Sequence, residues 1–230
     1  MEDTITGVEF YSNVKTTEVE WIWYPYIPCG KITMLQGDPG EGKSTLIIHI
    51  AAILTKGGYL PDGQKIKKPE IVIYQCSEDG KGDTIKPRLE QAGADCNRVA
   101  FIKDDNGELT LEDERIKNAI NQIGAKMVVL DPIQAFIGHN GNMTNAVKMR
   151  ETLSKLSKVA EETNCAIVLV GHMTKSSGGK QIYRGLGSID IAATVRSILM
   201  VSRDKEEPWK RYMFPVKSSL APEGEPIGFE

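Results

Sequence analysis

The stretch Gly37-Asp38-Pro39-Gly40-Glu41-Gly42-Lys43-Ser44 decides the fold of this chain. It fits the pattern G-x-x-x-x-G-K-[ST], follows an apolar run of strand length and precedes a run of helical length. Glycines let the backbone wrap closely round a phosphate, while successive N–H groups and the start of a helix supply positive potential. The stretch therefore predicts a phosphate-binding loop (P-loop), and a glycine-rich turn that matches by chance is the alternative.

The same loop predicts a site for Mg-ATP. Lys43 would reach the β- and γ-phosphates and neutralise charge during hydrolysis, while the Ser44 hydroxyl would ligate Mg²⁺. The apolar run Met127–Leu130 is followed by Asp131, which would bring a carboxylate to Mg²⁺ directly or through water. An acid that closes a strand by chance is the alternative. The residues expected to hold the nucleotide are Gly37, Asp38, Pro39, Gly40, Glu41, Gly42, Lys43, Ser44 and Thr45.

Hydrolysis needs a group that orients or deprotonates water near the γ-phosphate. Glu78 follows the expected strand Ile71–Cys76, so its carboxylate would face the carboxyl edge of a parallel sheet. Asp79 is its competitor, and a solvated turn is the alternative to both. His172 follows the expected strand Ala166–Val170, so a neutral imidazole there could sense the γ-phosphate. A structural histidine is the alternative.

Apolar runs of strand length alternate with amphipathic stretches of helical length, which is typical of βαβ units around a parallel sheet. Several runs are almost wholly apolar, as strands covered on both faces must be. We therefore expect an α/β fold with a mostly parallel central sheet flanked by helices. The expected strands are Ile32–Gln36, Ile71–Cys76, Val99–Ile102, Met127–Leu130 and Ala166–Val170, and the expected helices are Thr45–Lys56, Thr84–Ala94, Leu111–Ile123 and Thr144–Thr163.

The C-terminal part predicts an antiparallel hairpin on the sheet edge. Its strands, Ser197–Ser202 and Arg211–Lys217, are joined by a polar stretch. Gly228–Glu230 has the character of a further strand, so we expect that the chain was trimmed from a longer protein. We divide the chain into an N-terminal segment, residues 1–30, that packs on the core, and the core itself, residues 31–230.

Composition narrows the function classes. The 230 residues fit one large domain, and a net charge of -3 argues against a globally basic surface, although a local basic loop would not show in that sum. The 4 cysteines form no CxxC pair, which indicates free thiols in a reducing cytosol. No apolar run approaches the ~20 residues that span a bilayer, and the start of the chain is acidic. We expect a cytoplasmic protein with no membrane partner.

Longer motifs resemble a known family over nearly the whole chain, from Trp21 to Glu230. Ile73–Gly80 with the following Thr84–Ala94 is similar to the strand, catalytic acid and helix of RecA-like P-loop ATPases of the RepA type, found in replicative helicases of plasmids, phages and integrated elements. Val170–Lys175 resembles the sensor-histidine segment of RepA and RadA proteins. The resemblance implies a RecA-like ATPase fold, with Glu78 as the catalytic carboxylate and His172 as the sensor.

The resemblance also implies residues that act on a neighbouring subunit. Arg184–Arg196 resembles the RepA stretch that ends in an arginine contributed to the next subunit's ATP. Lys217 falls where related ring ATPases carry a lysine, but Ser219 stands where some carry a second basic residue. Arg196, supported by Lys217, is therefore the expected group in trans, and the implied assembly is a homo-oligomeric ring, a hexamer.

Two loops are candidates for contact with single-stranded DNA in the channel of such a ring. The first follows His172 and is rich in glycine and serine. Its Lys175, Lys180 and Arg184 can meet phosphates, and Tyr183 can stack on a base. The second candidate is Gly138–Met143, which carries less charge. A surface loop with incidental charge is the alternative.

Three functions fit these features. The first is an ATP-hydrolysing ring motor, the DNA helicase domain of a plasmid-, phage- or mobile-element-type replication protein. The second is an ATP-gated DNA-binding or loading switch that hydrolyses slowly and does not unwind. The third, a small-molecule kinase, is less favoured because no separate acceptor-binding lid is evident.

Overall fold

A mixed sheet of 8 strands forms the centre of the computed structural model, which describes residues 7–105, 107–138, 146–172 and 189–230. The strand order is β12-β11-β10-β3-β9-β8-β6-β7. From β10 to β7 every neighbouring pair is parallel, whereas β10, β11 and β12 pair antiparallel. The strands are β3 (Ile32–Gly37), β6 (Val72–Cys76), β7 (Val99–Ala100), β8 (Met127–Asp131), β9 (Ala166–His172), β10 (Ser197–Arg203), β11 (Arg211–Ser218) and β12 (Ile227–Phe229).

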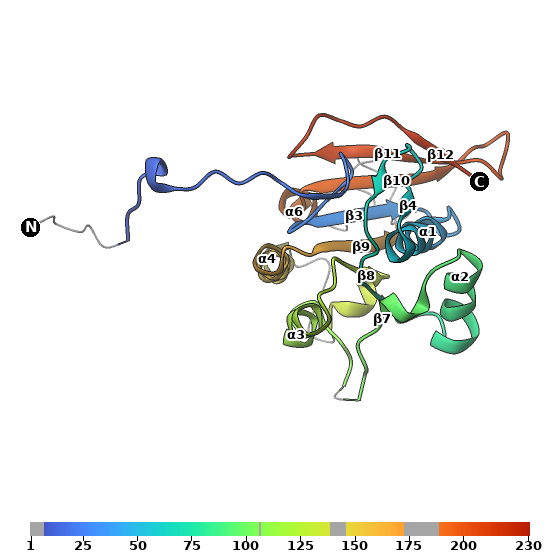
Figure 1. Ribbon diagram of the computed structural model, residues 1–230, viewed down its shortest axis with the longest axis horizontal. Coiled ribbons are helices and arrows are strands. Elements are labelled where there is room, and N and C mark those ends of the chain that lie inside the picture. Colours follow the sequence, from blue (N-terminus) through green and yellow to red (C-terminus); the bar gives the residue numbers. More distant parts are fainter. Residues whose placement is uncertain (1–6, 106, 139–145, 173–188) are drawn as a thin grey trace, which may run out of the picture.

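Helices cover both faces of this sheet (Figure 1). Helices α1 (Lys43–Lys56) and α2 (Lys86–Gln91) pack into one apolar cluster. Helices α3 (Glu114–Ile123), α4 (Ala146–Thr163) and α6 (Ile189–Thr194) pack into the other. Side chains of β3 alternate between the clusters, with Leu35 in the first and Met34 in the second, as the period of a strand requires. This architecture confirms the predicted α/β class with antiparallel C-terminal strands.

Some element boundaries differ from those expected. Helix α3 begins at Glu114 and not at Leu111, because the Asp113 carboxylate accepts a hydrogen bond from the Arg115 amide and caps the helix there. A π-turn, η2 (Lys81–Ile85), precedes α2. The short strand pairs β1 (Trp21–Trp23) with β2 (Ile27–Pro28) and β4 (Gly58–Tyr59) with β5 (Lys65–Ile66), and helix α6, had no predicted counterpart.

The N-terminal residues divide into two parts. Trp23 and Tyr26 are buried in the same cluster as α1, and the Tyr26 carbonyl accepts a hydrogen bond of 2.7 Å from the Ser197 hydroxyl. Residues 7–20 are exposed throughout and extend away from the body of the molecule (Figure 1). The proposed division at residue 30 stays a prediction.

None of the helices in the described ranges combines the length and the apolar character that a membrane crossing needs.

Candidate nucleotide site

The glycine-rich loop joins β3 to α1, as the sequence predicted. Gly40 and Gly42 have φ values of +81° and +95°, in the left-handed region that favours glycine. The Leu46 amide donates to the Gly42 carbonyl (2.9 Å), so the helical hydrogen bonds start at the end of the loop. The first amides of α1 therefore point toward the loop with no partner inside the helix, which creates positive potential there.

Lys43 is held inside this loop. It is only 4% exposed, and its ammonium group donates to the carbonyls of Gly37 (2.9 Å) and Asp38 (2.8 Å). Burial lowers the pKa of Lys43, while the carboxylates of Asp131, Asp38, Glu41 and Glu78 act in the opposite sense. These bonds fix the ammonium group over the loop, where it can exchange carbonyl partners for phosphate oxygens.

The carboxyl ends of three adjacent strands bring further polar groups to the loop. Gly37 of β3 pairs directly with His172 of β9, and Leu130 of β8 pairs with Leu169 of β9. Asp131, the next residue of β8, therefore lies at the same edge. It is 5% exposed, and its Oδ2 accepts a hydrogen bond of 2.9 Å from the Tyr74 hydroxyl.

Tyr74 orients Asp131 from β6. Burial, and secondly the Asp131 carboxylate, raise the pKa of Tyr74 well above its ordinary value. The phenol therefore remains a neutral donor, and it leaves Oδ1 of Asp131 as the oxygen available for a cation. Sequence reasoning did not identify this tyrosine, although a tyrosine inside a buried strand was a signal that a buried acceptor lay nearby.

Glu78 and Asp79 differ in their partners. The Asp79 carboxylate accepts a hydrogen bond of 2.7 Å from Arg88 on α2. Glu78 is exposed, and its Oε2 lies 3.9 Å from Nε2 of His172. The Nδ1 atom of His172 is buried and has no hydrogen-bond partner among the residues that the structure describes. Of the two acids, Glu78 faces the strand end that carries His172, whereas Asp79 is tied to α2.

The C-terminal strands close over the outside of the P-loop, which sequence reasoning missed. A Cβ atom at Gly37 would lie 2.4 Å from the Val201 carbonyl oxygen, and one at Gly42 would lie 2.7 Å from Cδ of Arg211. The Arg203 guanidinium donates to the Gly40 carbonyl (2.6 Å), and its amide donates to the Glu41 carboxylate. In the described part of the chain, the buried Nε of Arg211 has no hydrogen-bond partner. Two arginines of β10 and β11 thus belong to the walls of this site.

These features fit Mg-ATP. The loop offers free amides and glycines that leave space for phosphate groups, and Lys43 supplies a positive charge. Ser44, at the second position of α1, offers a hydroxyl, and Asp131 offers a carboxylate oxygen. Oxygen ligands of this kind are the ones Mg²⁺ prefers. Thr45 follows on α1 and is exposed.

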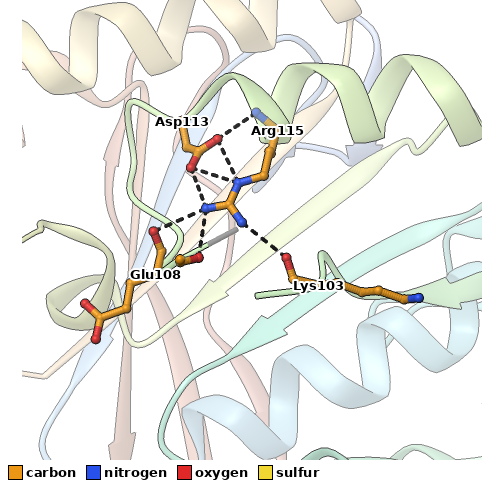
Figure 2. A network of polar contacts seen from close by, with 5 residues as sticks. Lys103, Glu108, Asp113 and Arg115 are labelled. Atoms are coloured by element: carbon orange, nitrogen blue, oxygen red, sulfur yellow. Dashed lines mark hydrogen bonds and ion pairs between the residues drawn. The ribbon is translucent and has the colours of Figure 1, made fainter. Parts of the chain in front are cut away.

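A cavity of about 640 Å³ adjoins Glu78 and extends to the loop that follows β8. Its wall includes Glu108, in the loop between β7 and α3, and Figure 2 shows how that loop is held. The Arg115 guanidinium donates to the carbonyls of Lys103 (3.2 Å), Gly107 (3.0 Å) and Glu108 (3.2 Å) and binds the Asp113 carboxylate at 2.7 Å. Arg115 thus fixes one wall of the cavity next to Glu78.

Arg196 and Lys217 lie at the opposite, amino edge of the sheet. The exposed Arg196 immediately precedes β10, and its amide donates to the carbonyl of Ile32 at the start of β3. The Lys217 ammonium donates to the carbonyls of Ala192 (2.7 Å) and Val195 (2.8 Å) at the end of α6, and burial, followed by Arg196, lowers the pKa of Lys217. Neither residue is close to the P-loop of its own chain.

The residues expected to contact DNA, Lys175, Lys180, Tyr183 and Arg184, fall outside the described residues, as does the second candidate loop, Gly138–Met143, apart from Gly138.

Fold and site together define a RecA-like P-loop ATPase. A parallel sheet with the strand–loop–helix unit at its centre carries an acid at the end of β8. A family model described as "AAA domain" matches residues 5–178, and the chain belongs to this family.

Curated relatives are similar to the chain over 64% of its length. They include proteins named "DNA repair protein RadA" from Chlamydia muridarum (27% identical over 150 residues), Chlamydia trachomatis (28% over 149) and Halalkalibacterium halodurans (27% over 151). The matched region covers 29%, 29% and 28% of these relatives, respectively, so the chain corresponds to less than a third of their length.

Proposed function

We propose that the chain hydrolyses Mg-ATP and uses the cycle to act on DNA as a ring-forming ATPase. The observation that carries the proposal is the convergence of Lys43, Asp131, Glu78 and His172 at the carboxyl edge of β3, β8, β6 and β9. A buried cation, a metal-binding carboxylate and an exposed carboxylate beside an imidazole are the groups that phosphoryl transfer to water requires.

Each group has a distinct role in this proposal. Lys43 and the loop amides hold the β- and γ-phosphates, while Ser44 and Asp131 hold Mg²⁺, which would neutralise charge on the phosphate oxygens. Glu78 orients and deprotonates the attacking water, and His172 responds to the γ-phosphate. The pairing of Asp79 with Arg88 supports Glu78 as the base, because the described contact of the Glu78 carboxylate is with His172 and not with an arginine.

The ring is proposed to be a hexamer with single-stranded DNA in its channel. The positions of Arg196 and Lys217, far from their own P-loop, support a role at the ATP of the next subunit. An arginine delivered in this way stabilises charge that develops in the transition state. The finer assignment, within the same proposal, is a helicase motor of a plasmid-, phage- or mobile-element-type replication protein.

A second candidate is an ATP-gated DNA-binding or loading switch. It is favoured by the relatives' printed name, which concerns DNA repair and does not mention replication or unwinding. The two candidates differ in one measurable property, since a motor separates a forked duplex while it hydrolyses ATP and a switch changes only its assembly or its DNA affinity.

The deciding experiment is phosphate release from Mg-ATP with and without single-stranded DNA, followed by unwinding of a forked duplex. The proposal expects that single-stranded DNA stimulates ATP turnover by the wild-type chain. Glu78→Gln protein, purified in the same way, serves as the control for contaminating ATPase activity. Absence of phosphate release from the wild-type chain under all these conditions would overturn the ATPase proposal. Turnover without strand separation would select the switch.

A further inference from the structure

Glu41 places a carboxylate inside the P-loop, two residues before Lys43. Burial lowers the pKa of Lys43, and Glu41 is one of the carboxylates that oppose this shift, so the charge of Glu41 acts at the phosphate-binding ammonium group. The same charge would repel a nucleoside triphosphate in the loop, because salt screens charges weakly when they lie close together in a partly buried site. Binding of the phosphates therefore depends on where the Glu41 carboxylate points.

Arg203, the last residue of β10, holds two consecutive residues of the loop. Its amide donates a hydrogen bond to Oε2 of Glu41, and its guanidinium donates to the Gly40 carbonyl at 2.6 Å. The carbonyl and the amide of one trans peptide point in opposite directions. Because the Gly40 carbonyl points toward Arg203, the Glu41 amide is turned into the loop, where it donates to the Asp38 carbonyl at 3.3 Å.

Gly40 is the point at which this arrangement can change. Its φ is +81°, and a glycine moves between the left-handed and right-handed regions at little steric cost. Without the guanidinium, the peptide between Gly40 and Glu41 is free to rotate and to carry the Glu41 side chain toward the phosphates. The sheet keeps Arg203 in place, because β10 pairs with β3 as far as Met200 and its pairing with β11 includes Arg203 itself.

We propose that Arg203 is a positioning residue for nucleotide binding, because its bond to Gly40 keeps the Glu41 carboxylate turned away from the phosphates. The ligand class is a nucleoside polyphosphate, and the contribution of Arg203 grows with the negative charge of the bound phosphates. The inference rests on the proposed function, since it concerns the nucleotide that this function requires. It gives the β10–β11 hairpin control over nucleotide affinity and leaves the chemical step to the groups at the carboxyl edge of the sheet.

The test is a double-mutant cycle on Arg203 and Glu41, in which the full chain is titrated with fluorescent N-methylanthraniloyl-ATP and N-methylanthraniloyl-ADP. Arg203→Met should weaken ATP binding by about tenfold, the factor expected for loss of a hydrogen bond from a charged group. ADP binding should weaken less, because ADP has one phosphate fewer. In the Glu41→Gln background, Arg203→Met should weaken ATP binding by about twofold or less, since the amide carries no charge that repels the phosphates.

Lys205→Met is the matched control, because it removes an exposed positive charge from the same hairpin, and it should bind both nucleotides as the wild type does. Glu41→Gln alone leaves β10 undisturbed and should bind ATP at least as tightly as the wild type. Equal losses in the two Glu41 backgrounds, equal losses for ATP and ADP, or weaker ATP binding by Glu41→Gln would each overturn the inference. A wild-type chain that binds neither nucleotide would contradict the proposed function itself.

Discussion

Lys43 combines near-complete burial with a lowered pKa, because burial removes water from its ammonium group. Within the part of the chain that the structure describes, this group donates its hydrogen bonds to two carbonyl oxygens, those of Gly37 and Asp38. Arrival of a polyphosphate would replace these neutral acceptors with charged ones, and charge-assisted hydrogen bonds are about twice as strong as neutral ones.

Replacing Lys43 with alanine should therefore weaken Mg-ATP binding by about 100-fold, because charge-assisted hydrogen bonds to the phosphates are lost while the loop glycines remain. Titration calorimetry measures the change. Lys56→Ala, at the other end of α1, should bind as the wild type does. Equal affinity of Lys43→Ala and wild type would contradict the assignment of the P-loop.

Glu78→Gln should keep ATP affinity but lower turnover by about 100-fold or more, because the amide keeps the shape of the side chain and cannot accept the proton. Asp79→Asn is the matched control: it loses the ion pair with Arg88 and should retain most of the activity. Single-turnover phosphate release separates binding from chemistry. An inactive Asp79→Asn protein beside an active Glu78→Gln protein would reverse the assignment.

The sequence alone was sufficient to predict the positions of residues that lie at the end of a strand. The P-loop and the acid closing β8 both lie where a strand ends, and a strand end can be predicted from a short window. Arg203 and Arg211 could not be predicted in the same way. Their contacts with Gly40 and Gly42 depend on the pairing of β10 with β3, which joins segments more than 150 residues apart.

At the scale of elements, one side chain, Arg115, makes several of the contacts that hold the loop between β7 and α3. Arg115 binds backbone carbonyls on both sides of the loop tip and the Asp113 carboxylate that caps α3 (Figure 2). A planar guanidinium makes these bonds at once, and a lysine ammonium cannot reproduce that fork. Arg115 therefore fixes the polar part of the loop, while Ile102 and Leu109 anchor it in the apolar cluster.

Arg115→Lys should loosen this loop while the rest of the fold stays intact. Amide hydrogen exchange over residues 103–110 should accelerate by about tenfold, the factor expected from loss of one or more hydrogen bonds. Exchange in β3 and β9 is the internal control. Uniform acceleration over the whole chain would mean that Arg115 supports global stability instead.

The pH dependence of hydrogen exchange in this loop gives a second check on the contact between Arg115 and Asp113. Hydrogen bonds from Arg115 lower the pKa of Asp113 below its ordinary value of 3.8, so their stabilisation is present above that value and is lost as pH falls below it. Asp113→Asn removes this titration. Its loop exchange, corrected for intrinsic rates, should therefore change less than that of the wild type between pH 5 and pH 3.

The start of α3 shows where element-level reasoning succeeded and where it failed. The periodic pattern was read from Leu111, but Asp113 followed by Glu114 carries the stronger N-cap signal, and the helix begins there. Helix α6 has only six residues and was not predicted. A helix this short is stabilised by packing, here against α4, and a local stretch of sequence does not contain that tertiary contact.

At the scale of the whole molecule, the proposed ring makes catalysis a property of two chains. Arg196→Ala should bind ATP as the wild type does but lose most of its turnover, since a trans arginine contributes about a thousandfold or more to the rate. Mixing it with Lys43→Ala protein should restore partial activity, because some interfaces then combine an intact Lys43 with an intact Arg196.

Arg98→Ala is a suitable control, since Arg98 is a partly exposed arginine that also precedes a parallel strand, but that strand, β7, lies at the far end of the sheet from β10. It should retain wild-type turnover. No recovery in mixed oligomers whose composition has been verified would count against the trans role of Arg196.

The strand order also decides when the P-loop can form during synthesis. β3 lies between β9 and β10, which leave the ribosome more than 120 residues after it. Until β9 has emerged, β3 has neither of the strands that flank it in the sheet, and until β10 and β11 follow, the loop lacks Val201, Arg203 and Arg211 on its outer side. We expect nascent chains stalled before β10 to be protease-sensitive and unable to retain ATP, and chains released after β12 to be resistant. Nucleotide binding would then report that translation of this domain is complete, and a P-loop protected in the shorter chains would contradict this order.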